Sequence, residues 1–352
     1  MKRNAKQPKP SSAADLLALR EIVEHFPGKR IVVLGDFVAD SFQYGEITRV
    51  SREAPVLILR HRETRILPGG AANATNNFAA LGAKVLPISA IGDDSAGDWL
   101  LETFRDLNVD VSGIIRIKAG VTPTKTRFLA GWAHTVGHQV LRVDYEPVSQ
   151  IPESYQKKIL RLLLARIRKA DALAISDYGF GVATPAMVRR ATKLNKRGIP
   201  VSLDSRYHLL DFRRSGVTDA TPNEPEVEAL RNTIIGQNIP ALERSGRALL
   251  DEMKLRSLVI TRGRHGMAVF QSGQPSVHLP VHGSDQAVDV TGAGDTVLAA
   301  YTLALASGAS PVEAAHIANI AGGLVVMKRG TATVSHIELH DAIRKAASEV
   351  AS

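Results

Sequence analysis

Short apolar runs alternate along this chain with longer stretches in which apolar residues recur at helical spacing. The run IVVLG at 31–35 is fully apolar and ends in glycine, as expected of a buried parallel strand. Residues 71–82 follow with small and apolar residues at helical spacing and close on a glycine. This alternation predicts an α/β fold, ribokinase-like in the light of the motifs below, with an open, mostly parallel sheet covered by helices on both faces.

The same rhythm continues toward the C-terminus. We expect further strands at 84–91, 172–176, 200–203, 257–261 and 266–270, and helices at 95–107, 152–169, 184–197, 292–306, 311–327 and 336–347. The alternation of strands and helices stops in two segments, at about 41–60 and 122–145. Both are rich in β-branched residues that alternate with polar ones, and neither contains a helical pattern. They predict a small second β-sheet that acts as a lid.

The composition is that of a soluble globular protein, with 44% hydrophobic and 22% charged residues in a chain of 352. No run of about 18 apolar residues occurs, and no apolar stretch follows the N-terminal charges, so we expect neither a spanning helix nor a signal peptide. The chain has no cysteine. Disulfides, thiolate metal sites and cysteine nucleophiles are therefore excluded, and a cytoplasmic location is expected.

The net charge is +9, from 44 basic and 35 acidic residues. The first ten residues, MKRNAKQPKP, hold four of these positive charges and no acid, and we expect residues 1–15 to form a disordered basic tail ahead of one domain at 16–350. The remaining charge is spread along the chain. It fits a basic site for anionic small molecules better than a nucleic-acid footprint, and neither nucleic acid nor membrane is expected as a partner.

The strongest chemical signal is DVTGAGD at 289–295, which runs directly into the apolar helix expected at 292–306. Gly292 and Gly294 free the backbone to place N–H groups at the start of that helix. The unpaired donors of a first turn and the helix dipole bind phosphate or a developing negative charge. Asp295 would lie beside that phosphate and accept a proton from an attacking hydroxyl. The alternative is a glycine-rich turn in which Asp295 caps the helix.

Four motifs in order make the chain resemble the ribokinase-like (PfkB) carbohydrate kinases over residues 28–345. They are PGGAANATNN at 68–77, TPNEPEVEAL at 221–230, TRGRHGMAVF at 261–270 and DVTGAGDTVLAAY at 289–301. The resemblance implies ATP-dependent transfer of a phosphoryl group to a sugar hydroxyl, with Asp295 as the general base. It assigns the anion hole to the backbone amides of Gly292, Ala293 and Gly294.

The resemblance also implies a site for sugar hydroxyls at Gly69, Gly70 and Asn73. It adds Asp36, at the end of the first strand. Glycines allow close backbone approach, an asparagine offers both a donor and an acceptor, and ligands of open α/β sheets lie at the carboxyl ends of strands. The alternative is a Gly-Gly turn with Asn73 capping the following helix.

The residues expected to bind the nucleotide and its metal ion are assigned by the same resemblance. Asn223 and Glu226 match an N-x-x-E pattern that organises Mg²⁺ through water near the ATP phosphates, and a sparse oxygen site suits that ion. The same two residues are also typical of a capping box at a helix start, and both roles are compatible. The remaining positions border the nucleotide phosphates, namely Thr261, Gly263 and Gly266, although an ordinary strand-turn-strand explains them equally.

Two further positions follow from the resemblance alone. Asn319 lies where the family packs the adenine ring, with a residue satisfied in the core as the alternative. Asp289 matches an acidic position that helps to hold a monovalent cation such as K⁺ in several relatives. The expected cofactors are therefore ATP and Mg²⁺, with K⁺ as a further candidate.

A closer resemblance concerns the substrate. The segments 44–60, 123–146 and 321–335 are similar to those of the D-glycero-D-manno-heptose 7-phosphate kinases, which phosphorylate the C1 hydroxyl at the start of nucleotide-activated heptose synthesis for lipopolysaccharide. The expected lid carries basic residues suited to a substrate phosphate: Lys125, Arg127, Arg142, Arg49 and Arg52. Solvent-facing strand edges commonly carry such residues as well. WAHTVGH at 132–138 departs from the pattern of those kinases.

Other functions stay open at this point. The chain could be a related kinase of another sugar, sugar phosphate or nucleoside, or a non-catalytic sugar- or nucleotide-binding regulator on the same fold. A dehydrogenase and a P-loop enzyme are disfavoured, because G-x-G-x-x-G does not follow the first strand and G-x-x-x-x-G-K-[ST] does not occur. No H-x-G-H motif of a fused adenylyltransferase is present. By resemblance we expect a homodimer that pairs through the lid.

Overall fold

The computed structural model describes residues 13–131, 138–148, 150–283 and 286–351. Its centre is a nine-stranded sheet in the order β13-β12-β11-β10-β9-β8-β1-β4-β5. The strands are β1 (Arg30–Gly35), β4 (Lys84–Ile91), β5 (Ile114–Arg116), β8 (Ala172–Asp177), β9 (Val201–Ser205), β10 (Asp219–Ala220), β11 (Ser257–Thr261), β12 (Met267–Gln271) and β13 (Val277–Leu279). Near one edge β12 pairs antiparallel with both β11 and β13, and every other pair of neighbouring strands is parallel. The predicted parallel sheet is confirmed.

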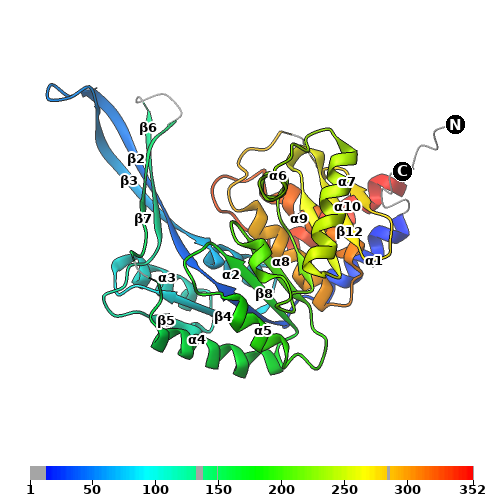
Figure 1. Cartoon of the computed structure of the whole chain (residues 1–352). Helices are drawn as coiled ribbons and strands as arrows, with labels where there is room; N and C mark the ends of the chain where they lie inside the picture. Colours follow the sequence, from blue (N-terminus) through cyan, green and yellow to red (C-terminus); the bar gives the residue numbers. More distant parts are fainter. Residues whose placement is uncertain (1–12, 132–137, 149, 284–285, 352) are drawn as a thin grey trace.

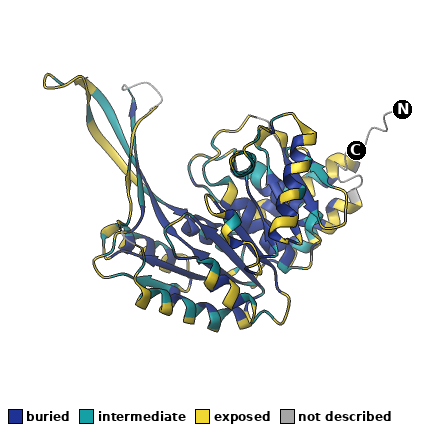
Figure 2. Ribbon diagram, in the orientation of Figure 1, coloured by how far each residue is buried: buried dark blue, intermediate teal, exposed yellow. Residues whose placement is uncertain are grey.

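Helices cover both faces of this sheet (Figure 1). They are α1 (Ala13–Glu24), α2 (Ala71–Ala80), α3 (Ser95–Asp106), α4 (Glu153–Arg166), α5 (Pro185–Thr192), α6 (Glu224–Arg231), α7 (Ile239–Met253), α8 (Ala293–Ala306), α9 (Pro311–Val325) and α10 (His336–Ala351). Alternate residues of β1 enter two separate cores: Ile31 and Val33 pack with α1, α2, α3, α8, α9 and α10, while Val32 and Leu34 pack with α4, α5 and α7. Each face of the central strands is therefore buried (Figure 2).

The chain differs from the sequence-based expectation at helix α5 and at helix α1. Helix α5 stops at Thr192 rather than near residue 197, because the Asn195 side chain bonds both the backbone N–H and the carbonyl of Ile199 and so competes with further helical turns. Helix α1 was not predicted from the sequence, and it begins at Ala13, so residues 13–15 are helical rather than part of a tail. Residues 1–12 of the expected tail lie outside the described residues.

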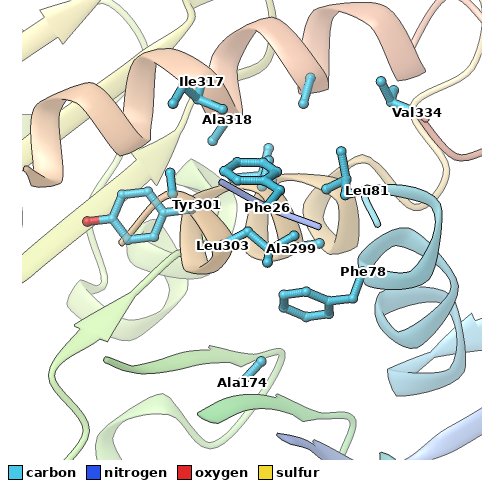
Figure 3. Packing of buried hydrophobic residues seen from close by; sticks show 14 of the residues in the cluster. Phe26, Phe78, Leu81, Ala174, Ala299, Tyr301, Leu303, Ile317, Ala318 and Val334 are labelled. Atoms are coloured by element: carbon cyan, nitrogen blue, oxygen red, sulfur yellow. The ribbon is translucent and has the colours of Figure 1, made fainter. Parts of the chain in front are cut away.

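Helix α8 is apolar on all sides and lies between α2 and α9 (Figure 3). Ala299, Tyr301 and Leu303 point from it into the core, with Phe78 of α2 nearby and Ile317 of α9 on the other side. A helix that is hydrophobic all round is held by packing rather than by solvent contact. The polar residues at its N-terminus are therefore carried on a rigid element. Although α8 is strongly apolar, no helix within the described residues is both long and apolar enough to cross a membrane.

A second, four-stranded sheet stands away from the body in the order β3-β2-β6-β7 (Figure 1). Its strands are β2 (Phe37–Val50), β3 (Leu57–Gly70), β6 (Thr124–Gly131) and β7 (His138–Tyr145). The predicted small sheet is confirmed, and it is longer than expected, since β2 begins at Phe37 and β3 runs to Gly70. In the segment WAHTVGH at 132–138, which departs from the pattern of the heptose 7-phosphate kinases, residue 138 is the first residue of β7. Residues 132–137 lie outside the described residues.

Only Asp36 separates β1 from β2. The first five residues of β2 are buried against the body, and its last three are exposed toward the hairpin tip (Figure 2). The base of the small sheet therefore lies directly at the carboxyl end of the central strand β1, which is the edge where open α/β sheets bind ligands.

Candidate active site

The start of α8 has a geometry that only glycine satisfies at residue 292. Gly292 is the N-cap residue with φ of 77°, a left-handed conformation that favours glycine. A Cβ atom there would lie 2.5 Å from Nδ2 of Asn73, which is too close for any other residue without displacement. Gly292 thus lets α2 approach the first turn of α8, where Asp295 occupies the third helical position.

The three amides predicted to form the anion hole differ in their hydrogen bonds. The amide of Ala293 donates a 3.2 Å hydrogen bond to the carbonyl of Val290, so it is already engaged. The amides of Gly292, Gly294 and Asp295 have no acceptor within the part of the chain that the structure describes. A helix start with three unpaired donors attracts a negative group.

A buried polar network holds the Asp295 side chain. Nδ2 of Asn73 donates to Oδ2 of Asp295 at 2.7 Å. Asn77, one turn further along α2, donates to the carbonyl and to Oδ1 of Asn73, and it accepts a 2.7 Å bond from the Thr296 hydroxyl. Both polar ends of Asn73 are thereby used. The structure gives Asn73 a positioning role, and it is not the helix cap of α2, where Gly70 stands without a side-chain cap.

The other carboxylate oxygen of Asp295, Oδ1, is buried and has no hydrogen-bond partner among the described residues. The residue is 3% exposed and lines a cavity. Burial raises its pKa to about 7, and the Asp40 charge raises it further, against the lowering effects of the Asn73 hydrogen bond, the Lys125 charge and the nearby Tyr178 hydroxyl, which lies outside hydrogen-bond distance of Oδ1. A carboxylate with a free oxygen and a pKa near neutrality is equipped to take up a proton.

The Asp36 side chain is engaged by backbone groups. Its carboxylate accepts hydrogen bonds from three backbone amides of the loop after β8, at 2.8 Å from Tyr178, 3.2 Å from Phe180 and 3.0 Å from Val182. The residue is 1% exposed, and burial raises its pKa to about 6 despite these bonds. The side chain fastens the 178–182 loop to the end of β1, and its contact with a sugar stays a prediction.

Asp40, four residues further along, is the acid that the sequence reasoning missed. It lies at the base of β2, pairs with Arg127 of β6, and acts electrostatically on Asp295. A Cβ atom on Gly69 would lie 2.3 Å from Oδ2 of Asp40, so the first of the two predicted glycines makes room for this carboxylate. A Cβ atom on Gly70, where φ is 56°, would lie 2.7 Å from the carbonyl oxygen of Asp36, so the second glycine makes room for that backbone group.

Two cavities meet at the start of α8. The Asp295 cavity, about 690 Å³, contains the polar residues Asp177, Tyr178, Asp204, Arg206, Glu226 and Asp295 in its wall. The Asn319 cavity, about 540 Å³, is lined by five residues predicted for the nucleotide: Asn223, Thr261, Gly263, Gly266 and Asn319. The two cavities share Asn223, Pro225, Thr261, Val290 and Gly294. Gly294 and its unpaired amide therefore stand at the junction.

The capping interpretation of Asn223 and Glu226 is confirmed. The Asn223 side chain accepts from the Glu226 amide, and the Glu226 carboxylate accepts from the Asn223 amide, both at 2.9 Å. On the far side of the Asn319 cavity, Asn319 donates to the carbonyl of Pro280 at 2.7 Å and so fixes the wall.

Two acidic residues, Asp204 and Glu226, line the Asp295 cavity. Of the two, only Glu226 was predicted from the sequence. Burial raises the pKa of Asp204, and the charges of Glu226 and Asp295 raise it further. Burial likewise raises the pKa of Glu226, while Arg206 lowers both. Within the described ranges no three His, Asp or Glu side chains form a metal cluster. Two half-buried carboxylates that repel each other nevertheless fit a Mg²⁺ ion that keeps several waters.

Asp289 joins two loops. Oδ1 accepts from the Thr291 amide and Oδ2 from the Gly330 amide, each at 2.9 Å. Burial raises its pKa, but these hydrogen bonds outweigh burial and the net pKa lies below the ordinary value. Asp289 thus fixes the turn that leads into Gly292, and its contact with a monovalent cation stays a prediction.

The basic residues expected in the lid separate into two groups. Lys125 and Arg127 lie at the base of the small sheet, where Nζ of Lys125 is 5.0 Å from the centroid of the Tyr178 ring. Arg142 faces Arg127 across β6 and β7. Arg49 and Arg52 are exposed at the far hairpin tip, and nine residues of strand from Asp40 to Arg49 span about 30 Å. These two arginines line neither the Asp295 cavity nor the Asn319 cavity of this chain.

A family model described as pfkB family carbohydrate kinase matches residues 29–338. The chain belongs to this family. It is 36% identical over 323 residues to the Bifunctional protein HldE of Geobacter sulfurreducens and 40% identical over 326 residues to that of Caulobacter sp. strain K31, with 91% of this chain covered in both cases. The chain spans 64% of the length of each relative.

Solved structures agree on the fold. The Arabidopsis thaliana ribokinase complexed with ribose and ATP superposes with a TM-score of 0.70 at 18% identity, covering 90% of this chain and 99% of that one. Phosphofructokinase-2 from Escherichia coli in complex with potassium gives 0.72 at 19% identity, covering 92% and 100%. The expected ribokinase-like fold is confirmed, and family membership places the chain among the carbohydrate kinases.

Proposed function

We propose that the protein transfers the γ-phosphoryl group of ATP to the C1 hydroxyl of D-glycero-D-manno-heptose 7-phosphate, giving heptose 1,7-bisphosphate and ADP. The observation that carries the kinase reaction is the unpartnered Oδ1 of Asp295 beside the free amides of Gly292 and Gly294, among the described residues, at the junction of two cavities. The heptose substrate is supported by the resemblance of segments 44–60, 123–146 and 321–335 and by relatives that carry the HldE name.

The chemistry follows from this arrangement. Oδ1 of Asp295 accepts the proton of the acceptor hydroxyl, and the hydroxyl oxygen attacks the γ-phosphorus. The bond to the bridging oxygen of ADP breaks, and ADP leaves with that electron pair. The amides of Gly292, Gly294 and Asp295 stabilise the negative charge on the transferring group, which is the main task of a protein in phosphoryl transfer.

ATP would occupy the Asn319 cavity, because it opens onto the anion hole at Gly294. Asn319 would border the adenine, with Thr261, Gly263 and Gly266 near the phosphates. Asp204 and Glu226, with Asn223 beside them, would hold Mg²⁺ through water, and the ion when bound neutralises phosphate charge. A K⁺ ion near Asp289 is supported by the potassium complex of phosphofructokinase-2.

The same proposal includes the cellular role and the assembly. The product would supply nucleotide-activated heptose for lipopolysaccharide synthesis in the cytoplasm. The small sheet would pair with its copy in a homodimer, which is supported by exposed apolar side chains on β7, where Leu141 and Tyr145 are 55% and 56% exposed.

A substrate panel tests the proposal. Purified protein with ATP and Mg²⁺ is offered heptose 7-phosphate, fructose 6-phosphate, ribose and a nucleoside, with coupled ADP detection and phosphorus NMR of the product. Turnover of heptose 7-phosphate to a product with an anomeric phosphate supports the proposal. Turnover of another acceptor alone assigns a different kinase, and ATP binding without any ADP release indicates a regulator.

A further inference from the structure

Two cations lie in or beside the wall of the Asp295 cavity and come from different parts of the chain. Lys125 extends from β6 of the small sheet over the ring of Tyr178, which lines the cavity. Arg206 follows directly after β9 and lines the cavity itself. Lys125 and Arg206 are close enough for the charge of one to alter the pKa of the other. The small sheet and the body thus each contribute one positive charge.

Among the residues that the structure describes, neither cation has a carboxylate partner. The neighbouring arginines of the small sheet do, since Arg127 pairs with Asp40 and Arg142 pairs with Asp144. Across the same ranges, no ion pair involves Lys125 or Arg206. Lys125 is partly buried, and an unpaired cation in a partly desolvated position is costly, so an anionic ligand would remove that cost, while the exposed Arg206 is accessible to the same ligand.

The surrounding charges strengthen this expectation. Burial lowers the pKa of Lys125, the carboxylates of Asp40 and Asp144 raise it, and the positive charges of Arg206 and Arg142 lower it again. Asp40 and Asp144 are the cross-strand neighbours of Lys125, but each is bonded to an arginine, so neither carboxylate is available to Lys125 alone. An anion between Lys125 and Arg206 would relieve the repulsion.

We propose that Arg206 and Lys125 form the subsite for a phosphate group that the acceptor sugar already carries, which makes Arg206 a specificity-determining residue. The inference rests on the proposed function and names the recognition element for its phosphorylated acceptor. The guanidinium fork of Arg206 suits bidentate phosphate binding, and Lys125 adds a point charge. Arg127 and Arg142 then act by orienting Asp40 and Asp144.

A different role for Arg206 makes a contrasting prediction. Its charge lowers the pKa of Asp204 and of Glu226, so it could serve only to balance these acids. It could also contact the transferring phosphoryl group. In both cases its loss would impair every acceptor equally, because neither role involves the sugar phosphate.

The experiment compares kcat/KM for heptose 7-phosphate and for the same heptose without its phosphate, at saturating ATP. The variants are Arg206→Gln and Lys125→Gln, with Arg206→Lys as the conservative replacement. Arg161→Gln, an exposed position on α4, is the matched control for the charge change. For the phosphorylated sugar we expect each Gln variant to lose about 10–100-fold, mainly through KM, as expected for charge-assisted hydrogen bonds. At about pH 9, where Asp295 is ionised with or without the Lys125 charge, the unphosphorylated heptose should change by less than about 3-fold, and Arg206→Lys should recover part of the loss.

Equal losses on both acceptors, or no loss on heptose 7-phosphate, overturn the subsite while leaving the kinase proposal intact. If the wild-type protein phosphorylates a different sugar phosphate, the heptose assignment fails, and the same selective loss on that sugar still supports the subsite. If calorimetry shows that sugar phosphates bind the wild-type protein no more tightly than the parent sugars, the subsite is refuted whatever the reaction.

Discussion

The side-chain amide of Asn73 donates a 2.7 Å hydrogen bond to Oδ2 of Asp295, so a residue of α2 fixes the carboxylate at the start of α8. The second oxygen of Asp295 is left without a partner among the described residues. One oxygen is thus used for orientation and the other is available for proton transfer. This division of labour explains why a buried carboxylate can be both well positioned and reactive.

Replacing Asn73 by Ala should lower kcat by about 10–100-fold and leave the KM for ATP nearly unchanged, because orientation of the base is lost. The hydrogen bond lowers the pKa of Asp295, so its removal should raise that pKa and shift the acid limb of the kcat/KM profile to higher pH. Thr75→Val is the control, since its buried hydroxyl on the same helix bonds only the carbonyl of Ala71 among the described residues. An unshifted pH profile would contradict the positioning role.

Asp295→Asn should bind ATP normally and lose about 10²–10⁴-fold in kcat, which is the usual contribution of a general base. Nucleotide binding is followed by calorimetry and turnover by ADP release. In the wild-type protein, kcat/KM should rise with pH through about 7, because the free enzyme must lose the Asp295 proton before it can accept another. Near-normal turnover in the Asn variant would remove Asp295 from the mechanism.

The raised pKa of Asp295 also makes a prediction about stability. The group titrates near its ordinary value of 3.8 when unfolded and near 7 when folded, so its favourable contribution is complete below about pH 4 and is lost as the pH rises through about 7. Asp295→Asn removes the cost of burying the charge. We expect its free energy of unfolding to exceed that of the wild type increasingly with pH, by on the order of 1–4 kcal/mol at pH 8.5.

Urea unfolding at pH 5, 7 and 8.5 measures this difference. Asp289→Asn serves as the comparison, because the pKa of Asp289 is lowered in the folded protein. Its contribution is present above the unfolded pKa and is lost as the pH falls through the folded pKa, so the Asn variant should be less stable than the wild type at pH 7 and 8.5. A difference for Asp295→Asn that does not grow between pH 5 and 8.5 would argue against a buried charge there.

Features encoded by local pattern could be predicted from the sequence. The apolar runs of the parallel strands and the motif at 289–295 each depend on neighbouring residues, and the structure places them as expected. Helix α7 (Ile239–Met253) was missed, although Asn238 as its cap and apolar residues at helical spacing were visible signals.

Residue roles that depend on distant parts of the chain could not be predicted. Asp36 stands at a strand end, which favours ligand binding, yet its partners are amides more than 140 residues away. Arg49 belongs to a predicted lid segment, but only the register of β2 and β3 shows that it lies at the tip. Asp40 and Arg206 carried no local motif. Their importance follows from what the fold brings beside them.

Gly292→Ala tests whether the approach of α2 to α8 depends on the missing side chain. The new Cβ would occupy a position with φ of 77° and lie 2.5 Å from Nδ2 of Asn73, so it should displace Asn73 from Asp295. We expect a loss of about 1–3 kcal/mol in the free energy of unfolding and at least about 10-fold in kcat.

Gly308→Ala, at the other end of α8, has φ of 98° and no atom within 4 Å of the new Cβ among the described residues. It should therefore cost stability through backbone strain alone and leave kcat unchanged. Equal losses of kcat in the two variants would mean that strain, rather than the Asn73 contact, explains the requirement for glycine.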